Sequence, residues 1–162
     1  MKLILIRHAK SSWDDLNQDD HDRPLNDRGR RAAPRIGQWL ADHDHRPELV
    51  LCSSAARTQE TFARMKDALG GPRLELRPDL YHAAPAHMLD LLHGQTADSI
   101  ALIAHNPGIG DLAQRLAAEL PEHPRFLDYP TAATTVFEID SWADIAPHTA
   151  RVIGFVTPRD LA

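Results

Sequence analysis

The chain opens on an apolar run that ends abruptly in a cation and a histidine, and this feature constrains its fold most. Leu3–Ile6 are four consecutive branched aliphatic residues, and Arg7 and His8 follow directly. A short continuous run of this kind is typical of a strand buried on both faces of a sheet. Ligand sites in open α/β sheets lie at the carboxyl ends of strands. Arg7 and His8 therefore stand where such a site would form, and together they suit an anion and a nucleophile.

Two later apolar runs end in similar residues. Residues 49–52 lead into a serine- and alanine-rich segment that carries Arg57, and residues 99–104 end at His105. The carboxyl ends of parallel strands share one edge of a sheet. A single arginine or histidine after a strand means little, but three such endings in one small chain indicate a shared site. The residues expected at that edge are Arg7, His8, Arg57 and His105.

The alternation of strand-like and helix-like segments predicts a single α/β domain over residues 1–162. It favours a three-layer α/β/α sandwich with a mostly parallel central sheet and antiparallel closing strands. Asp27 and Ser54 are candidate N-caps. Pro34 lies inside the first helix and favours a late start or a kink. Strands are expected at 2–7, 48–52, 74–76, 99–104, 133–140 and 151–156, and helices at 28–42, 54–68, 85–92 and 109–120.

Composition excludes several classes of function. The net charge is −5 and there is no block of basic residues, so neither nucleic acid nor an anionic membrane is an expected partner. The opening apolar run is too short for a signal peptide, and no stretch approaches the roughly 20 apolar residues of a membrane span. The single cysteine, Cys52, cannot form an internal disulfide and fits a reducing compartment. A cytoplasmic protein is therefore expected.

The four residues expected at the sheet edge suit the transfer of a phosphoryl group. A histidine attacks phosphorus only through an unprotonated nitrogen, and a free histidine has a pKa near about 6.5. Arg7 and Arg57 are expected to disfavour the imidazolium form of His8 and so to keep it nucleophilic. Their planar guanidinium groups can also hold phosphoryl oxygens. His105 would add a hydrogen bond to the phosphoryl group from a rigid strand end.

These residues belong to longer segments that resemble a known family. The chain is similar to the histidine phosphatase (phosphoglycerate mutase-like) superfamily, and in particular to its small branch, the SixA-type phosphohistidine phosphatases. The similarity extends from residue 3 to about residue 112, with a looser match from Tyr129 to Trp142. The matching segments are Leu5–Asp14, Asp22–Leu25 with Gly29, Ser53–Thr61, Leu80-Tyr81 and Ala104–Pro107.

The resemblance implies a mechanism and a set of roles. It implies that His8 is the phosphorylated nucleophile, and that Arg7, Arg57 and His105 form the phosphate-binding pocket. No metal and no cofactor are expected to take part. Asp14 falls where mutase-like members carry an asparagine that faces the phosphate, but a carboxylate would repel that phosphate.

The proton donor is left open by the sequence. Larger members use a glutamate just after the segment that matches Leu80-Tyr81, and the nearest residue here is His82. Asp20 and Asp22 are the other candidates, although either could be a solvated loop carboxylate or a partner of Arg23. A phosphorylated imidazole can leave after protonation of its own ring, whereas an alkoxide needs an acid from the enzyme. The absence of a glutamate thus favours a phosphoramidate substrate.

We expect a phosphatase that acts on phosphohistidine in a protein, because the short chain offers little cover for a small ligand. One alternative is a small-molecule phosphomonoesterase of the same superfamily, and mutase activity is disfavoured because it must exclude water. A non-enzymatic alternative is a phosphate-recognition module, which would be expected to lack one of the four pocket residues. Cys52 and Arg57 are separated by four residues rather than the five of cysteine phosphatases, which disfavours a thiolate mechanism.

Overall fold

The computed structural model describes residues 1–162 and contains one sheet of six strands. The strands are β1 (Lys2–Arg7), β2 (Leu49–Ser53), β3 (Arg73–Arg77), β4 (Ser99–Ala104), β5 (Thr134–Glu138) and β6 (Arg151–Val156). The helices are α1 (Asp27–Asp42), α2 (Ala56–Met65), α3 (Pro85–His93) and α4 (Gly108–Leu116). Three short 3-10 turns complete the chain: η1 (Asp20–Asp22), η2 (Pro78–Leu80) and η3 (Pro158–Leu161).

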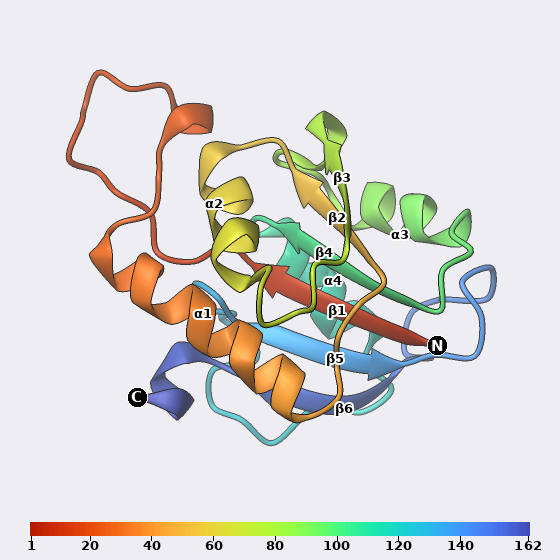
Figure 1. Ribbon diagram of the computed structural model, residues 1–162. Helices are drawn as coiled ribbons and strands as arrows, with labels where there is room; N and C mark the ends of the chain where they lie inside the picture. Colours follow the sequence, from red (N-terminus) through yellow and green to blue (C-terminus); the bar gives the residue numbers. More distant parts are fainter.

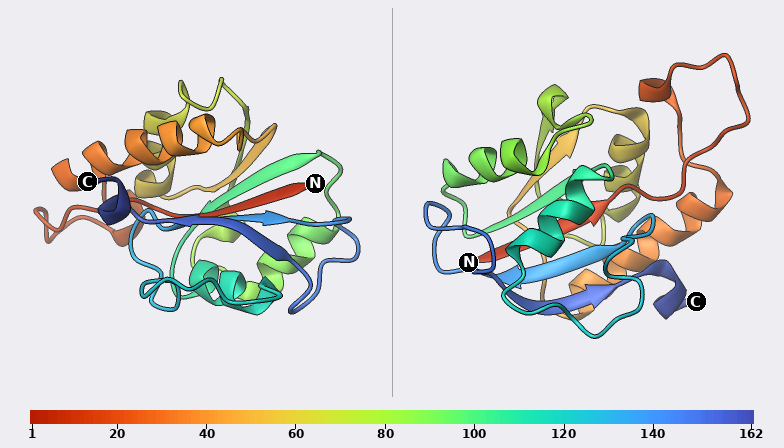
Figure 2. Two further views of the ribbon diagram at one scale, coloured as in Figure 1. Left: turned by 90° about the horizontal axis from the view of Figure 1, so that it is seen from below. Right: turned by 180° about the vertical axis from the view of Figure 1, so that it is seen from behind.

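The sheet has the strand order β3-β2-β4-β1-β5-β6. The first four strands in this order pair in parallel, whereas β5 and β6 are antiparallel additions at one edge. α1 and α2 cover one face of the sheet, and α3 and α4 cover the other (Figure 1; Figure 2). The predicted three-layer α/β/α sandwich with antiparallel closing strands is confirmed.

The path of the chain places a topological switch point at the carboxyl ends of three strands. From β1 the chain runs through α1 to β2 and through α2 to β3 at the edge, and then returns through α3 to β4, between β2 and β1. The crossover changes the face that the helices cover. In open α/β sheets the crevice at such a switch point is where ligands bind. The carboxyl ends of β1, β2 and β4 therefore border the expected site.

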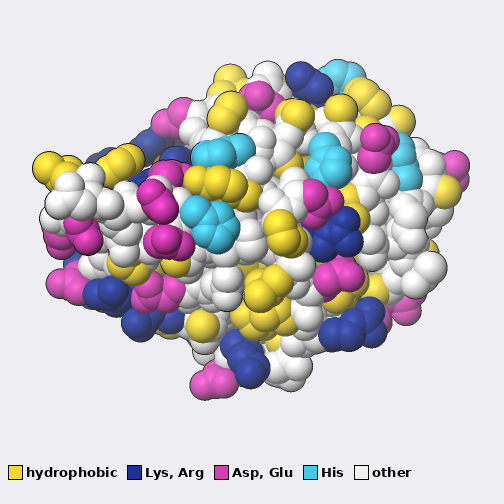
Figure 3. Space-filling view, turned by 90° about the horizontal axis from the view of Figure 1, so that it is seen from above, with side chains coloured by type: hydrophobic (Ala, Val, Ile, Leu, Met, Phe, Trp, Pro, Cys, Tyr) yellow, Lys and Arg dark blue, Asp and Glu magenta, His cyan; other side chains and the backbone are white.

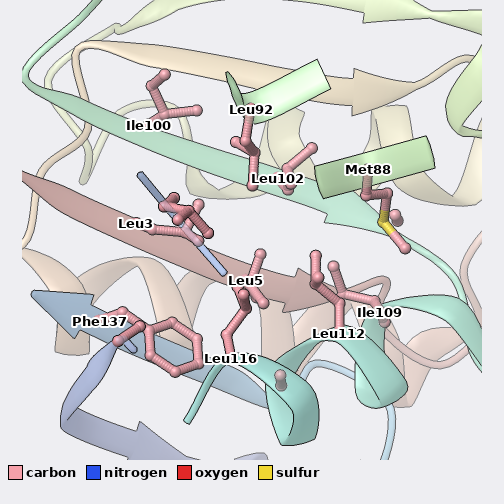
Figure 4. Packing of buried hydrophobic residues seen from close by; sticks show 14 of the residues in the cluster. Leu3, Leu5, Met88, Leu92, Ile100, Leu102, Ile109, Leu112, Leu116 and Phe137 are labelled. Carbon is pink, nitrogen blue, oxygen red and sulfur yellow. The ribbon is translucent and has the colours of Figure 1, made fainter. Parts of the chain in front are cut away.

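Side chains of β1 anchor both hydrophobic cores. Leu3 and Leu5 belong to the core under α3 and α4, and Ile4 and Ile6 to the core under α1 and α2. Figure 4 shows Leu3 and Leu5 among side chains of the first core. All four are fully buried, and each such side chain contributes about 1.5–3 kcal/mol. This packing holds β1 rigidly, and with it the residues that follow the strand.

The start of α1 differs from the prediction by one residue. Asn26, not Asp27, is the N-cap, because its side chain accepts the backbone N–H of Gly29 at 2.9 Å and its own backbone is extended. Pro34 does not delay the helix, which runs through it. Pro34 is exposed, so its ring faces solvent rather than the sheet.

The ends of two other helices also differ. α2 begins after Ala55 without a side-chain cap, because the hydroxyl of Ser54 is paired with the ring of His21 at 2.9 Å. α4 ends at Leu116, because Ala117 adopts an extended conformation and forms a β-bridge with Ala150. None of the helices has the length and apolar character needed to cross a membrane.

Candidate active site

The carboxyl ends of β1, β2 and β4 bring the four predicted residues together. Arg7 ends β1 and His8 follows it, Arg57 lies in the first turn of the helix after β2, and His105 follows β4. The ring centroids of His8 and His105 are 5.3 Å apart. The exposed fractions are 6% for His8, 3% for Arg57 and 4% for His105, so the cluster lies below the surface.

His8 is held in the form that can act as a nucleophile. Its Nδ1 lies 2.7 Å from the carbonyl oxygen of Ala9. A carbonyl only accepts hydrogen bonds, so Nδ1 carries the ring proton and Nε2 keeps its lone pair. Burial, with a smaller contribution from the charges of Arg57 and Arg7, lowers the pKa of His8 to about 3 against the opposing effect of this hydrogen bond. Burial, more than the arginines that the sequence suggested, keeps His8 neutral.

Arg7 and Arg57 place positive charge beside His8. One terminal nitrogen of Arg7 donates to the carbonyl of Tyr129 at 3.1 Å. The Nε atoms of Arg7 and Arg57 are buried and have no hydrogen-bond partner within the protein. A buried donor without a partner is costly, so an anion that accepts from these groups would be stabilised. Arg57 also lies at a helix N-terminus, where free backbone N–H groups favour negative charge.

His105 is fixed by the strand next to its own. Its Nε2 lies 2.8 Å from the hydroxyl oxygen of Ser53, at the end of β2. Its Nδ1 is buried and has no partner, like the Nε atoms of the two arginines. Burial, with smaller contributions from His8 and Arg57, lowers the pKa of His105 to about 2. The ring is therefore neutral at pH 7 and can serve as a hydrogen-bonding group for an anion.

Asp20, from the loop over residues 9–26, binds Arg57. Its backbone carbonyl and its carboxylate accept from the two terminal nitrogens of Arg57 at 2.7 Å and 3.1 Å. Arg23 and the hydroxyl of Tyr81 also donate to this carboxylate. Burial raises the pKa of Asp20, but the hydrogen bonds from Tyr81, Arg57 and Arg23, with the charge of Arg57, outweigh it and lower the pKa well below the usual range. Asp20 is thus ionised, which argues against its role as the proton donor.

The other donor candidates occupy different places. Nε2 of His82 lies 3.5 Å from the carboxylate of Asp20, and its ring centroid is 5.8 Å from that of His105. Its side chain is 59% exposed, and its backbone has a φ of 57°, a left-handed conformation that costs energy for a non-glycine residue. Asp22 is exposed and faces His21, while Asp14 lines a separate surface hollow of the loop. Histidine and acidic side chains lie close together on the face over η1 and η2 (Figure 3).

Several residues that orient the site could not be recognised from the sequence. Ser53 and Tyr81 lie in the matching segments but received no role, although they hold His105 and Asp20. Arg23, predicted only as a partner of acidic loop residues, is buried and also donates to Ser11 at 2.9 Å. Trp13 is 63% exposed, and the guanidinium carbon of Arg23 lies 3.6 Å from the centroid of its ring. No pattern in the sequence indicates that Arg23, an arginine within an acidic loop, would be buried.

Cys52 takes no part in the cluster. It is fully buried within the sheet, and burial raises the pKa of its thiol to about 12, so it is not a thiolate at pH 7. This agrees with the prediction that the cysteine-phosphatase pattern is accidental. No group of three or more histidine, cysteine, aspartate or glutamate side chains is arranged to hold a metal ion.

The buried histidines make stability depend on pH. An unfolded histidine has a pKa near about 6.5, whereas the folded protein lowers the pKa of His8 to about 3 and that of His105 to about 2. The folded pKa values lie below the unfolded ones, so this contribution is complete above the unfolded pKa and is lost as the pH falls. As the pH falls from about 7.5 to about 5, each of these two histidines is expected to lower the free energy of unfolding by about 2 kcal/mol.

Urea unfolding at both pH values tests this expectation. In a His105→Gln variant, the decrease in the free energy of unfolding between the two pH values is expected to be about half as large, because one of the two histidines is gone. The exposed His43 serves as the control, and His43→Gln is expected to keep the full loss. An equal loss in wild type and His105→Gln would contradict the assignment.

Taken together, the fold and the cluster define an α/β protein with a buried neutral histidine close to two arginines, an arrangement whose chemistry suits phosphoryl transfer. The histidine phosphatase superfamily (branch 1) matches residues 3–84 of the chain. An uncharacterised protein of Mycobacterium tuberculosis is 33% identical over 95% of this chain and 100% of its own length. The chain belongs to the histidine phosphatase superfamily.

Two solved structures share nearly the whole chain. One is from Agrobacterium tumefaciens, with 29% identity, a TM-score of 0.82 and coverage of 97% of both chains. The other is from Nakamurella, with 30% identity, a TM-score of 0.81 and coverage of 97% of this chain and 95% of the other. Both are assigned as phosphohistidine phosphatases SixA. The similarity supports the activity of a histidine-type phosphatase.

Proposed function

We propose that the protein hydrolyses phosphohistidine in a protein substrate through a covalent phosphohistidine intermediate on His8. The observation that carries the proposal is the neutral His8, with Nε2 unprotonated, beside three buried nitrogens that lack partners. In the first step Nε2 forms a bond to phosphorus while the N–P bond of the substrate breaks, and the substrate ring, already protonated by solvent on its other nitrogen, leaves as neutral imidazole. In the second step water attacks phosphorus, the bond to Nε2 breaks and inorganic phosphate leaves.

Arg7, Arg57 and His105 would hold the phosphoryl oxygens through both steps. Charge in phosphoryl transfer spreads over three equatorial oxygens, so clamping by fixed donors contributes most of the stabilisation. Arg57 is fixed by Asp20, Arg7 by the carbonyl of Tyr129 and His105 by Ser53. Because each donor is already oriented, little reorganisation is needed when the transition state forms.

The preference for phosphohistidine rests on the leaving group. Asp20 is ionised and bound to Arg57, so it cannot supply a proton. An imidazole can leave neutral after protonation of its own ring, whereas an alkoxide needs an acid. The SixA assignment of two relatives that span nearly the whole chain points in the same direction. A small phosphomonoester is the second candidate substrate. Its leaving group would need a proton donor, and His82, which lies beside Asp20, is the remaining candidate.

Trapping the intermediate tests the mechanism. Rapid quenching during turnover is expected to give a phosphorylated protein whose phosphate is labile in acid and stable in base. This stability is that of an N–P bond and differs from that of phosphoserine. Peptide mapping by mass spectrometry is expected to place it on His8. Phosphate on another residue would contradict the mechanism. Binding of phosphate without any turnover would support a phosphate-recognition module instead.

Replacing His82 distinguishes the two substrate classes. In His82→Ala, hydrolysis of a phosphohistidine peptide is expected to keep most of its rate, while hydrolysis of a phosphomonoester falls by roughly 10²-fold, the usual contribution of an acid. The measurement is kcat/KM for both substrates in both proteins. His87→Ala, at an exposed histidine of α3, is the control. An equal fall for both substrates would show that His82 does not act on the leaving group.

A further inference from the structure

A strip of positively charged side chains borders the active site, although the chain as a whole is negatively charged. Two grooves share Arg28, Ala32, Pro158 and Arg159, so they form one continuous surface. One groove extends to Lys10 and Thr131, and the other extends along α1. We define the basic strip as the five exposed cations that line these grooves: Lys10, Arg28, Arg31, Arg35 and Arg159.

None of the five cations of the strip forms a salt bridge, although Arg28 also lines a hollow that holds Asp14, Asp15 and Asp27. Asp27, next to Arg28, faces Arg30 at 3.4 Å. Asp160, next to Arg159, pairs with His123 at 3.0 Å and also accepts from the backbone N–H of Thr157. Arg125 lines the same groove but pairs with Asp128 at 2.9 Å, which is why it is left out of the strip. The five cations of the strip are therefore available to an external anion.

One end of the strip lies close to His8 along the chain. Lys10 lies two residues after His8, and the carbonyl of His8 accepts the backbone N–H of Ala132 at 2.9 Å. Thr131, the neighbour of Ala132, lines the groove together with Lys10. The two segments that border His8 thus form one end of the strip. A macromolecule that presents its phosphorylated residue to His8 would have its own surface over these cations.

The spacing of the cations suits an extended surface rather than one small anion. Arg28, Arg31 and Arg35 follow each other at three and four residues along α1, which places them on one face of the helix. The helix rises by 1.5 Å per residue, so these three positions span about 10 Å. Lys10 and Arg159 continue the charge beyond the helix. One phosphate could contact only part of this length.

We propose that the basic strip is a docking surface for an acidic patch on the phosphohistidine-bearing protein, an inference that rests on the function proposed above. A partner with acidic residues beside its phosphorylated histidine would meet the strip as that histidine enters the site. A nucleic acid would fit less well, because its charge is continuous and would also meet the exposed acidic residues of the loop over residues 9–26, whereas an acidic patch on a protein can be confined to the strip. Complementary charge raises the rate of encounter and excludes wrong partners.

Two synthetic phosphohistidine peptides test the docking surface. One carries a run of glutamates separated from the phosphohistidine by a flexible spacer, and the other carries glutamines at the same positions. The wild-type enzyme is expected to show a kcat/KM roughly 10-fold higher for the acidic peptide, with an advantage that falls as salt is added. The variant Arg31→Glu/Arg35→Glu is expected to lose this advantage and to keep its kcat.

The control variant carries the same change of charge elsewhere. Arg73, on β3, and Arg115, on α4, are exposed and line neither groove, so Arg73→Glu/Arg115→Glu is expected to keep the preference for the acidic peptide. Equal kcat/KM for both peptides in wild type would overturn the inference. So would equal losses in the two variants, because they would show a general effect of net charge.

Binding of the unphosphorylated acidic peptide separates the inference from the proposed function. Fluorescence anisotropy is expected to show binding by wild type and by the control variant, but not by Arg31→Glu/Arg35→Glu. Binding without hydrolysis of the phosphorylated form would leave the docking surface standing and reject the proposed function. Hydrolysis of both phosphorylated peptides with no preference for the acidic one would support the proposed function and reject the docking surface. Binding of duplex DNA through Arg31 and Arg35, with none of the peptide, would make the strip a nucleic-acid surface and overturn the inference.

Discussion

Replacing His8 with alanine is expected to abolish turnover while the protein stays folded. The loss of the nucleophile of a covalent mechanism is expected to lower kcat by roughly 10³-fold or more, equivalent to about 4 kcal/mol of barrier. The imidazole is the group whose Nε2 is kept unprotonated by the hydrogen bond from Nδ1 to Ala9. Steady-state kinetics with a phosphohistidine peptide, together with circular dichroism of the variant, provide the measurement.

Two further variants separate chemistry from folding. His8→Asn retains a side-chain amide that can donate to the carbonyl of Ala9, but it has no nitrogen that can be phosphorylated, so it is expected to be as inactive as His8→Ala. His43→Ala, at an exposed histidine that follows the last residue of α1, is expected to keep full activity. Hydrolysis near the wild-type rate by a folded His8→Asn protein would reject the covalent mechanism.

The position of the site could be predicted because it depends on a simple topological rule. Apolar runs locate β1, β2 and β4, and the carboxyl ends of parallel strands in such sheets meet at one edge. Arg7, His8, Arg57 and His105 therefore follow from three local patterns, and no knowledge of the loops is needed. The antiparallel addition of β5 and β6 was predicted in the same way, from two β-rich segments at the end of the chain.

The contacts that orient these residues could not be predicted, because they join segments far apart in the sequence. Asp20 and Arg57 are separated by 37 residues, and Tyr81 and Asp20 by 61. Both contacts depend on the path of the loop over residues 9–26, which contains no regular periodicity. The same limit applies to the pKa of His8: two arginines beside it are visible in the sequence, whereas burial, the larger cause, is a property of the folded chain.

The acidic loop illustrates the difference between residue type and role. From sequence, Asp20 is one acid among several and a candidate donor of a proton. In the fold it receives hydrogen bonds from Arg23, Arg57 and Tyr81, which stabilise its ionised form. A carboxylate that already accepts hydrogen bonds from three donors is suited to positioning Arg57. In the proposed mechanism the loop therefore helps to build the phosphate pocket rather than to transfer protons.

Replacing Arg57 tests whether orientation of the guanidinium matters as much as its charge. Arg57→Ala is expected to lower kcat/KM by roughly 10³-fold, since a preoriented donor to the transferring group contributes about 3–4 kcal/mol. Arg57→Lys is expected to recover only a small part of this loss, because the three donors of a lysine radiate from one nitrogen and cannot reproduce the planar fork that reaches both acceptors of Asp20 while its Nε remains free for phosphate. Arg64→Ala, an exposed arginine of the same helix that pairs with Glu60, is the matched control and is expected to retain the wild-type kcat/KM. Inorganic phosphate inhibition measured alongside should weaken in Arg57→Lys but persist in Arg64→Ala. If Arg57→Lys hydrolysed phosphohistidine within a few-fold of wild type, charge alone would suffice, and the fixed geometry imposed by Asp20 would have no role in the transition state.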